Sequence, residues 1–325
     1  MLTAVTGVNW GDEGKGRVID LLAEKADIVV RYQGGNNAGH TVVTGQGKFI
    51  LNLLPSGILH SKVICILGDG MVVDPEHLSK EIAQIREKGV LVTPDNLRLS
   101  SRATISMPWH RAQDELEESR LAKTGAAFGS TKRGIAYAYS DKYRKKTIRM
   151  GDLLHIDEPR IQARLKMMLD SKNLELSGCY HQERMSYPAL LSWCEKQSAL
   201  FAPYICDTGS YLEAALKNGK NVVLEAQLGA MRDIDYGIFP YTSSSSTISA
   251  YGPIGAGIPG EHLNHVVGVL KAYSTCVGAG PFVAERAMPE AWMEALRKSG
   301  GEYGAATGRP RRVGPFDAVA SLYGL

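Results

Sequence analysis

Apolar and polar positions in the first 32 residues follow two alternating patterns. Residues 2–8 and 27–32 are short, mostly apolar runs of the kind that form buried strands. Between them, residues 17–25 carry apolar positions at helical spacing, preceded by a glycine-rich turn at residues 11–16. This order predicts a βαβ unit with a loop at the carboxyl end of its first strand.

A second strand and helix follow. Residues 62–68 form another buried-strand run. Asp74 is suited to cap a helix N-terminus, Pro75 to occupy its first turn, and Gly89 to end it. The alternation of strand and helix therefore continues.

The remaining pattern extends this α/β order. It predicts helices at 157–173, 211–219 and 289–300, and strands at 221–226 and 265–273. Alternating strands and helices favour an α/β fold with a mainly parallel central sheet flanked by helices. Because no composition boundary or long linker divides the chain, we expect a single domain over residues 1–325.

Composition narrows the class of protein. The chain has 325 residues, 44% of them hydrophobic, and a net charge of only +3, which argues against nucleic acid or a membrane surface as the main partner. Its five cysteines are scattered and have no metal-ligand spacing, which fits a reducing cytoplasm. No apolar run approaches the ~18 residues of a membrane span.

The glycine-rich turn, residues 10–16 (WGDEGKG), is a candidate phosphate loop. Backbone N–H groups between a strand and a helix, together with the positive helix end, bind phosphates. The loop differs from the ordinary P-loop pattern because Gly16 follows Lys15, where Ser or Thr would ligate Mg²⁺. Asp12 could supply that oxygen ligand instead. The alternative is a surface turn with solvated charges.

A second loop, residues 33–41 (QGGNNAGHT), follows the next strand and so lies at the same end of the sheet. Open α/β folds bind ligands at this end. A lone histidine is usually structural, but His40 shares a tight glycine- and asparagine-rich loop beside the predicted phosphate site. We therefore expect the two loops to line one crevice.

Together, WGDEGKG and GGNNAGHT resemble the motif pair of the adenylosuccinate synthetase family, which joins L-aspartate to IMP with GTP as co-substrate. The resemblance implies that Asp12 takes the proton from N1 of IMP and that His40 is the general acid. It also implies one Mg²⁺ per subunit, bound by Asp12 and the Gly39 carbonyl, while Lys15 holds phosphate. The γ-phosphoryl group of GTP would pass to O6 of IMP before the amine of aspartate displaces it.

Three further segments extend the resemblance. Residues 128–135 (FGSTKRGI) match a stretch in which Thr131 would touch the phosphate of IMP. Residues 224–235 match another, with Gln227 one position before the expected glutamine, where Leu228 stands, and Ser243 in place of a threonine. Lys145 stands where an arginine would reach the IMP of a neighbouring subunit, which implies a homodimer. On general grounds, the run KYRKK around Lys145 is a solvated basic face.

The third segment, residues 304–312 (GAATGRPRR), resembles the loop that closes on aspartate. Arginines suit a ligand with two carboxylates, although a basic surface run is an equal alternative without the other motifs. Cys276 stands where arginine is usual, with no neighbouring pattern of a nucleophile, and Pro315 replaces a tryptophan.

The resemblance assigns the following site residues. Predicted catalytic residues are Asp12, Lys15, His40 and Gln227. GTP contacts are Gly11, Asp12, Glu13, Gly14, Lys15, Gly16, Arg17, Gly39, His40, Thr41 and Arg311. IMP contacts are Asp12, Lys15, Asn37, Ala38, Gly39, His40, Thr131, Lys145, Gln227, Ser243 and Arg309. Aspartate contacts are Ala305, Ala306, Thr307, Gly308, Arg309 and Arg311.

Two hypotheses remain open at this stage. The family pattern continues past the phrase matching Phe316 and Asp317 into a guanine-reading portion, which this sequence does not include. The chain is then either an adenylosuccinate synthetase or an impaired paralogue that binds IMP or another purine nucleotide without turnover, or with an altered choice of triphosphate.

Overall fold

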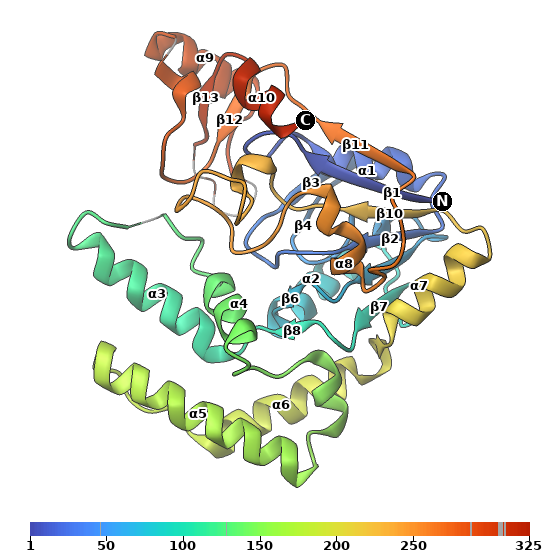
Figure 1. Cartoon of the computed structure of the whole chain (residues 1–325), viewed down its shortest axis with the longest axis vertical. Coiled ribbons are helices and arrows are strands. Elements are labelled where there is room, and N and C mark those ends of the chain that lie inside the picture. Colours follow the sequence, from blue (N-terminus) through green and yellow to red (C-terminus); the bar gives the residue numbers. More distant parts are fainter. Residues whose placement is uncertain (46, 128, 287, 305–307, 309) are drawn as a thin grey trace.

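A parallel sheet forms the centre of the molecule (Figure 1). The computed structural model describes residues 1–45, 47–127, 129–286, 288–304, 308 and 310–325. Within them, the sheet has seven strands in the order β11-β1-β10-β2-β5-β7-β9, each parallel to its neighbours. These strands are β1 (Leu2–Gly7), β2 (Ile28–Arg31), β5 (Ile64–Leu67), β7 (Leu97–Ser100), β9 (Ile205–Cys206), β10 (Val222–Glu225) and β11 (His265–Val269).

Three two-stranded sheets, ten α-helices and six short 3-10 helices complete the described part of the fold. The small sheets pair β3 (His40–Thr44) with β4 (Gly47–Leu51), β6 (Val72–Val73) with β8 (Thr104–Ile105), and β12 (Ser274–Cys276) with β13 (Arg312–Gly314). The helices are α1 (Lys15–Ala23), α2 (Pro75–Glu87), α3 (Pro108–Ala122), α4 (Ile135–Tyr143), α5 (Pro159–Tyr180), α6 (Tyr187–Phe201), α7 (Thr208–Lys217), α8 (Gly252–Ala256), α9 (Glu290–Ser299) and α10 (Ala318–Gly324).

Side chains of the central strands alternate between two hydrophobic cores, as the period of a strand requires. In β2, Val29 packs with α1 and α2 in the larger core, whereas Ile28 and Val30 pack with α7 and α8 in the smaller one. The sheet is thus covered on both faces. This explains why its strands are continuous apolar runs in the sequence.

The predicted α/β class and the mainly parallel sheet are confirmed. Each predicted strand and helix is present, with bounds that differ by a few residues, and α5 extends beyond the predicted 157–173 to Tyr180. Asp74 caps α2 as expected, since its Oδ1 accepts a hydrogen bond from the backbone N–H of His77 at 3.0 Å. That residues 1–325 form a single domain stays a prediction.

The sequence pattern did not predict α3, α4 or α6. With α5, these helices form a group beside the sheet (Figure 1). In α3 and α4, packing buries several polar side chains, including His110 and Gln113 of α3 and Asp141 of α4, so no continuous apolar stripe marks these two helices.

A buried ion pair joins this helical group. Asp141 of α4 lies 2.9 Å from Nζ of Lys172 on α5, and both side chains are almost fully buried. Nε2 of His110 donates to the same carboxylate at 2.9 Å, because its Nδ1 accepts from the backbone N–H of Met107. Burial raises the pKa of Asp141, but the hydrogen bonds from His110 and Lys172 outweigh burial, and the pKa is lowered. The Asp141 carboxylate is therefore ionised, and its negative charge stabilises the buried Lys172 ammonium.

We predict that Asp141→Asn lowers the free energy of unfolding by about 3 kcal/mol, because Lys172 then stays buried beside a neutral amide, with the partly exposed Glu175, at 3.2 Å, as its remaining anionic contact. Urea denaturation measures the change. Asp170→Asn is the matched control, since its pair with Lys166 is exposed, and it should change stability by less than about 1 kcal/mol. Equal effects of the two substitutions would contradict the proposed role of the buried pair.

Candidate functional site

The loop after β1 turns sharply before α1 begins. Gly11 and Gly14 have φ values of +93° and +92°, and Asp12 between them has φ +61°. Such values favour glycine and are uncommon for other residues, so the turn keeps the Asp12 carboxylate in an unusual position. Side chains of Asp12 and Lys15 consequently lie at the carboxyl end of the sheet.

Glu13 braces this loop from inside. Its Oε1 accepts a hydrogen bond from the backbone N–H of Gly11 at 2.7 Å, and its Oε2 lies 2.8 Å from Nζ of Lys15. Both charged side chains are buried. The ion pair is therefore an internal support, and it holds the Lys15 ammonium under the loop.

His40 stands at the start of the β3–β4 hairpin and is oriented by Glu225, the last residue of β10. Its Nδ1 lies 2.5 Å from Oε1 of Glu225. The same carboxylate accepts from the backbone N–H and the hydroxyl of Ser56, at 2.8 and 2.9 Å. Glu225 is fully buried, so three donors from two other segments satisfy it.

The charge state of His40 follows from this setting. Burial lowers the pKa of His40, and the hydrogen bond to Glu225 only partly offsets it. For Glu225, burial raises the pKa, but the bonds from His40 and the charge of Arg31 bring it below its ordinary value. At neutral pH, His40 is therefore neutral and Nδ1–H donates to an ionised Glu225, which leaves Nε2 as an acceptor.

Gln227 lies behind the second loop. Its Nε2 donates to Oδ1 of Asn37 at 3.0 Å, and its Oε1 accepts from Arg31 at 2.9 Å and from the backbone N–H of Gly35 at 3.1 Å. The side chain is fully buried and lines neither cavity described below. Leu228, with φ +66°, lines both. The amide of Gln227 is thus turned toward Asn37, which it orients.

Two cavities meet at the loops. The larger has a volume of about 890 Å³ and the smaller about 450 Å³. Both are lined by Asp12, Ala38, Gly39, Leu228 and Gly304. Their combined size suits two substrates rather than one.

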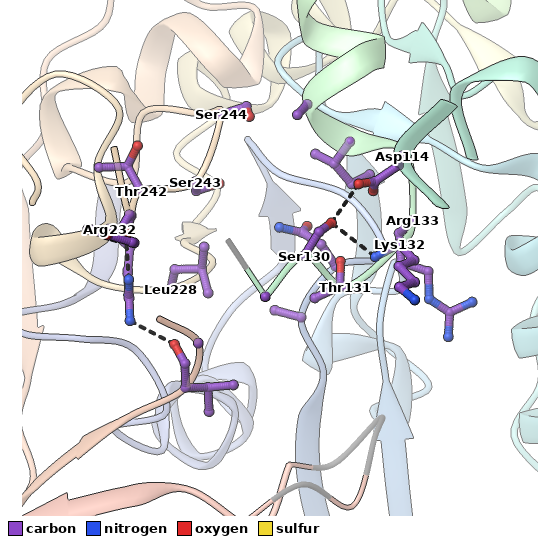
Figure 2. A pocket seen from close by; sticks show the side chains of 18 of the residues that line it. Asp114, Ser130, Thr131, Lys132, Arg133, Leu228, Arg232, Thr242, Ser243 and Ser244 are labelled. Atoms are coloured by element: carbon purple, nitrogen blue, oxygen red, sulfur yellow. Dashed lines mark hydrogen bonds between the residues drawn. The ribbon is translucent and has the colours of Figure 1, made fainter. Parts of the chain in front are cut away.

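Two walls from distant parts of the chain enclose the larger cavity, as Figure 2 shows. One wall carries Ser130 and Thr131, in a loop where Ser130 Oγ donates to Asp114 of α3 at 2.7 Å. The other carries Ser243 and Arg232. The Arg232 guanidinium donates to the carbonyls of Tyr241 and Val277 and contacts Sγ of Cys276, so it links the two loops of that wall.

A charged cluster lines the smaller cavity opposite the phosphate loop. Glu302 pairs with Lys271 at 2.8 Å and with Arg311 at 2.7 Å, and the Tyr273 hydroxyl donates to it. The second terminal nitrogen of Arg311 lies 3.1 Å from Oδ1 of Asp12. Asp12 is thus paired with a cation in the structure.

The predicted site residues divide into three groups. Those that line a cavity are Asp12, Gly14, Lys15, Gly16, Asn37, Ala38, Gly39, His40, Thr41, Thr131, Ser243 and Arg311. Those that line neither cavity are Gly11, Glu13, Arg17, Lys145, Gln227 and Gly308. Ala305, Ala306, Thr307 and Arg309 lie outside the described residues.

Some residues in the second group have structural partners. Glu13 and Gln227 brace the two loops, and Arg17 pairs at the surface with Asp20 at 2.9 Å. Lys145 is exposed, as is most of the run around it. Cys276 is buried, and burial raises the pKa of its thiol, which agrees with the absence of a nucleophile pattern in the sequence.

Sequence reasoning did not include Glu225, Lys271, Arg232 or Glu302 among the site residues. For Glu225 a signal was present, because a carboxylate that ends a predicted buried strand lies at the ligand-binding end of the sheet. For Glu302, no local pattern distinguishes it from a solvated acid.

The parallel sheet, a glycine-rich loop after β1 and two cavities that share lining residues at the carboxyl end are typical of α/β enzymes that bind a nucleotide and a second substrate. A family model described as adenylosuccinate synthetase matches residues 4–325. The chain belongs to the adenylosuccinate synthetase family.

Individual relatives agree with this assignment. The adenylosuccinate synthetase of Carboxydothermus hydrogenoformans is 45% identical over 317 residues, which are 98% of this chain and 72% of that protein. That of Pelotomaculum thermopropionicum is 44% identical over 321 residues, 99% of this chain and 73% of that protein.

No described helix is both long and apolar enough to cross a membrane.

Two solved structures resemble the fold. The fully ligated adenylosuccinate synthetase of Plasmodium falciparum has a TM-score of 0.89 at 37% identity, covering 99% of this chain and 73% of that one. A cyanophage S-2L succinoaminodeoxyadenylate synthetase has a TM-score of 0.66 at 20% identity, covering 98% of this chain and 79% of that one. The second likeness concerns the fold alone.

We predict that Gly34→Ala destabilises the protein by about 2 kcal/mol or more. Gly34 has φ +80°, and a Cβ there would lie 1.9 Å from Oε1 of Gln227, so the substitution strains the backbone and displaces the amide that orients Asn37. Thermal denaturation measures the loss. Gly260→Ala is the control, because a Cβ at Gly260 would meet no atom within 4 Å. Equal melting temperatures for Gly34→Ala and the unchanged protein would contradict this view of the loop.

Proposed function

We propose that this chain joins L-aspartate to IMP, with GTP converted to GDP and phosphate, and that Asp12 and His40 carry the proton transfers. The observation that carries the assignment of roles is the position of Asp12. Its carboxylate lines both cavities, and the smaller cavity also contains His40 and Lys15. A reaction that transfers a group between two bound nucleotides needs such a junction.

The cavities suit the two nucleotides differently. The smaller one is bounded by the phosphate loop and the start of α1, so we assign the phosphates of GTP to it. The larger one has room for a nucleoside monophosphate, with Thr131, Asn37 and Ser243 available for hydrogen bonds. Arg311, between Asp12 and the Glu302 cluster, is suited to an anionic group such as a carboxylate of aspartate.

The proposed chemistry has two steps. Asp12 removes the proton from N1 of IMP, O6 attacks the γ-phosphorus of GTP, and the bond from that phosphorus to the β-phosphate oxygen breaks to release GDP. The amine of aspartate then attacks C6, the C6–O bond breaks as phosphate leaves with both electrons, and the proton that the nitrogen loses leaves with the phosphate. An oxygen that leaves poorly thus becomes a good leaving group, and the protein mainly positions the reactants and neutralises charge.

His40 fits the acid role through its Nε2. Nδ1 is held by Glu225, so the ring is fixed and only Nε2 can exchange a proton with a ligand. The ring, neutral at neutral pH, must first gain a proton. The negative charge of a bound triphosphate would raise the pKa of His40 and so favour the protonated imidazolium.

The residues present fit a Mg²⁺ ion held largely by nucleotide phosphates. The Asp12 carboxylate and the Gly39 carbonyl offer hard oxygen ligands where both cavities meet. The described residues contain no group of three or more acidic, histidine or cysteine side chains that could hold a metal by themselves. This is usual for Mg²⁺, which keeps waters and substrate oxygens and, when bound, neutralises charge on the transferred phosphoryl group.

Further properties complete the proposal. A homodimer, in which Lys145 reaches the IMP of the partner, is supported by the exposure of that residue, which lines neither cavity of its own subunit. A cytoplasmic location is supported by the scattered free cysteines. The Ala305 to Gly308 segment and Arg309 remain proposed aspartate contacts, and Arg309 a proposed IMP contact, by resemblance to the family.

The comparisons with relatives do not support an impaired paralogue better than they support the ligase. Purified protein incubated with IMP, aspartate, Mg²⁺ and either GTP or ATP separates the hypotheses. Formation of adenylosuccinate with GTP supports the ligase. Binding of IMP with no product under either triphosphate would support the alternative, and product with ATP alone would indicate an altered nucleotide choice.

We predict that Asp12→Asn and His40→Asn each lower kcat by at least about 100-fold, because each removes a proton-transfer group. Initial rates of adenylosuccinate formation measure the effect. Circular dichroism should show an unchanged fold. Asp95→Asn, a loop residue that lines neither cavity, is the control and should keep the full rate. A normal rate in either site variant would exclude its assigned role.

We predict that binding of a non-hydrolysable GTP analogue with Mg²⁺ takes up a proton at neutral pH. Burial holds the pKa of His40 below its ordinary value, and the anionic ligand raises it. Affinity should therefore be strongest at low pH and fall as pH rises through the raised pKa of the complex. Calorimetry in two buffers of different ionisation enthalpy measures the uptake.

The matched variants are His40→Asn, which should lose the uptake, and His262→Asn, an exposed histidine, which should keep it. Equal proton uptake by wild type and His40→Asn would show that another group takes the proton.

A further inference from the structure

Glu302 is a buried carboxylate in the wall of the smaller cavity, in the segment between α9 and β13. It has no part in the chemistry proposed above. Its side chain is only 3% exposed, although it faces a site in which anionic substrates are expected. A buried negative charge beside an anion site calls for a physical reason.

Cations and a hydroxyl satisfy this carboxylate. Oε1 lies 2.8 Å from Nζ of Lys271 and accepts from the Tyr273 hydroxyl, while Oε2 lies 2.7 Å from Arg311. The carbonyl of Glu302 also accepts from the backbone N–H of Arg311 at 2.9 Å. Glu302 therefore contacts both the backbone and the side chain of Arg311.

Glu302 is ionised at neutral pH. Burial raises its pKa, but hydrogen bonds from Lys271, Tyr273 and Arg311 outweigh burial and lower the pKa below its ordinary value. Without this negative charge, the Lys271 ammonium and the Arg311 guanidinium would repel each other across a poorly solvated gap.

Arg311 has two unequal partners. One terminal nitrogen bonds to Glu302, and the other lies 3.1 Å from Asp12, whose side chain is 31% exposed. The Glu302 contact is buried and reinforced by the backbone, whereas the Asp12 contact opens on the cavity. If a divalent cation takes the Asp12 carboxylate, the nitrogen facing Asp12 becomes available to another anionic oxygen.

We propose that Glu302 is a positioning residue, which fixes the Arg311 guanidinium at the junction of the two cavities so that its outward nitrogen exchanges Asp12 for an anionic oxygen of a substrate. This inference rests on the proposed function. The oxygen belongs to a carboxylate of aspartate or to the triphosphate, and the kinetics below distinguish these sources.

The test compares three single variants of the full chain. Glu302→Gln keeps the shape and removes the charge, and Glu302→Asp keeps the charge. Glu285→Gln is the matched control, because Glu285 also pairs with an arginine, Arg312, but lines neither cavity. Initial rates with each substrate varied in turn, and melting temperatures with and without IMP, GDP, Mg²⁺ and succinate, are measured for each.

For Glu302→Gln, KM for either aspartate or GTP should rise by about tenfold or more, while KM for IMP changes little. A rise for aspartate assigns the oxygen to its carboxylate, and a rise for GTP assigns it to the triphosphate. The thermal shift produced by succinate, a dicarboxylate without the amine, should shrink in the first case only. Glu302→Asp should recover part of the loss, and Glu285→Gln should behave as wild type.

A double-mutant cycle tests whether Glu302 acts through Arg311. Adding Glu302→Gln to Arg311→Met should raise KM no further than Arg311→Met alone. Additive losses would overturn the inference, as would an unchanged KM for both aspartate and GTP, or an equal rise for all three substrates with a lowered melting temperature. Absence of turnover by the wild-type chain would instead overturn the proposed function, so the two failures are distinguishable.

Discussion

The site depends on one constraint: several buried charges at the carboxyl end of the sheet must each be paired. Glu225 ends β10 with no exposure to solvent, and it is satisfied by His40 and Ser56 from two other segments. An unpaired carboxylate there would cost several kcal/mol. Meeting this requirement brings the β3–β4 hairpin against the sheet, which orients His40 toward the smaller cavity.

The same requirement separates residues that brace the site from residues that face substrates. Glu13 and Gln227 have their hydrogen-bonding groups satisfied inside the protein and hold the two loops. Asp12 instead faces both cavities and has an exchangeable partner. Because the polar groups of Glu13 and Gln227 are paired within the protein, they are not available to a ligand. Asp12 remains available.

Recognition of the second substrate depends on parts of the chain that are far apart in sequence. The larger cavity lies between the loop at Ser130, supported by α3, and the loop at Ser243, linked to residues 276–277 by Arg232 (Figure 2). Its shape therefore depends on the packing of the helical group, in which Ser140 lines the cavity and the next residue, Asp141, forms the buried pair with Lys172. Stability of that group and geometry of the site are coupled in this way.

From its sequence alone, the chain's α/β class, its βαβ beginning and the two loops beside β1 and β2 were predictable, because short-range periodicity, caps and glycines act locally. The helices α3 and α4 were not, since they bury polar residues whose partners lie on other elements. The family resemblance identified Gln227, yet only the fold decided that its amide points to Asn37 rather than into a cavity. Which way a polar side chain turns depends on partners that are distant in sequence, and local pattern carries no record of them.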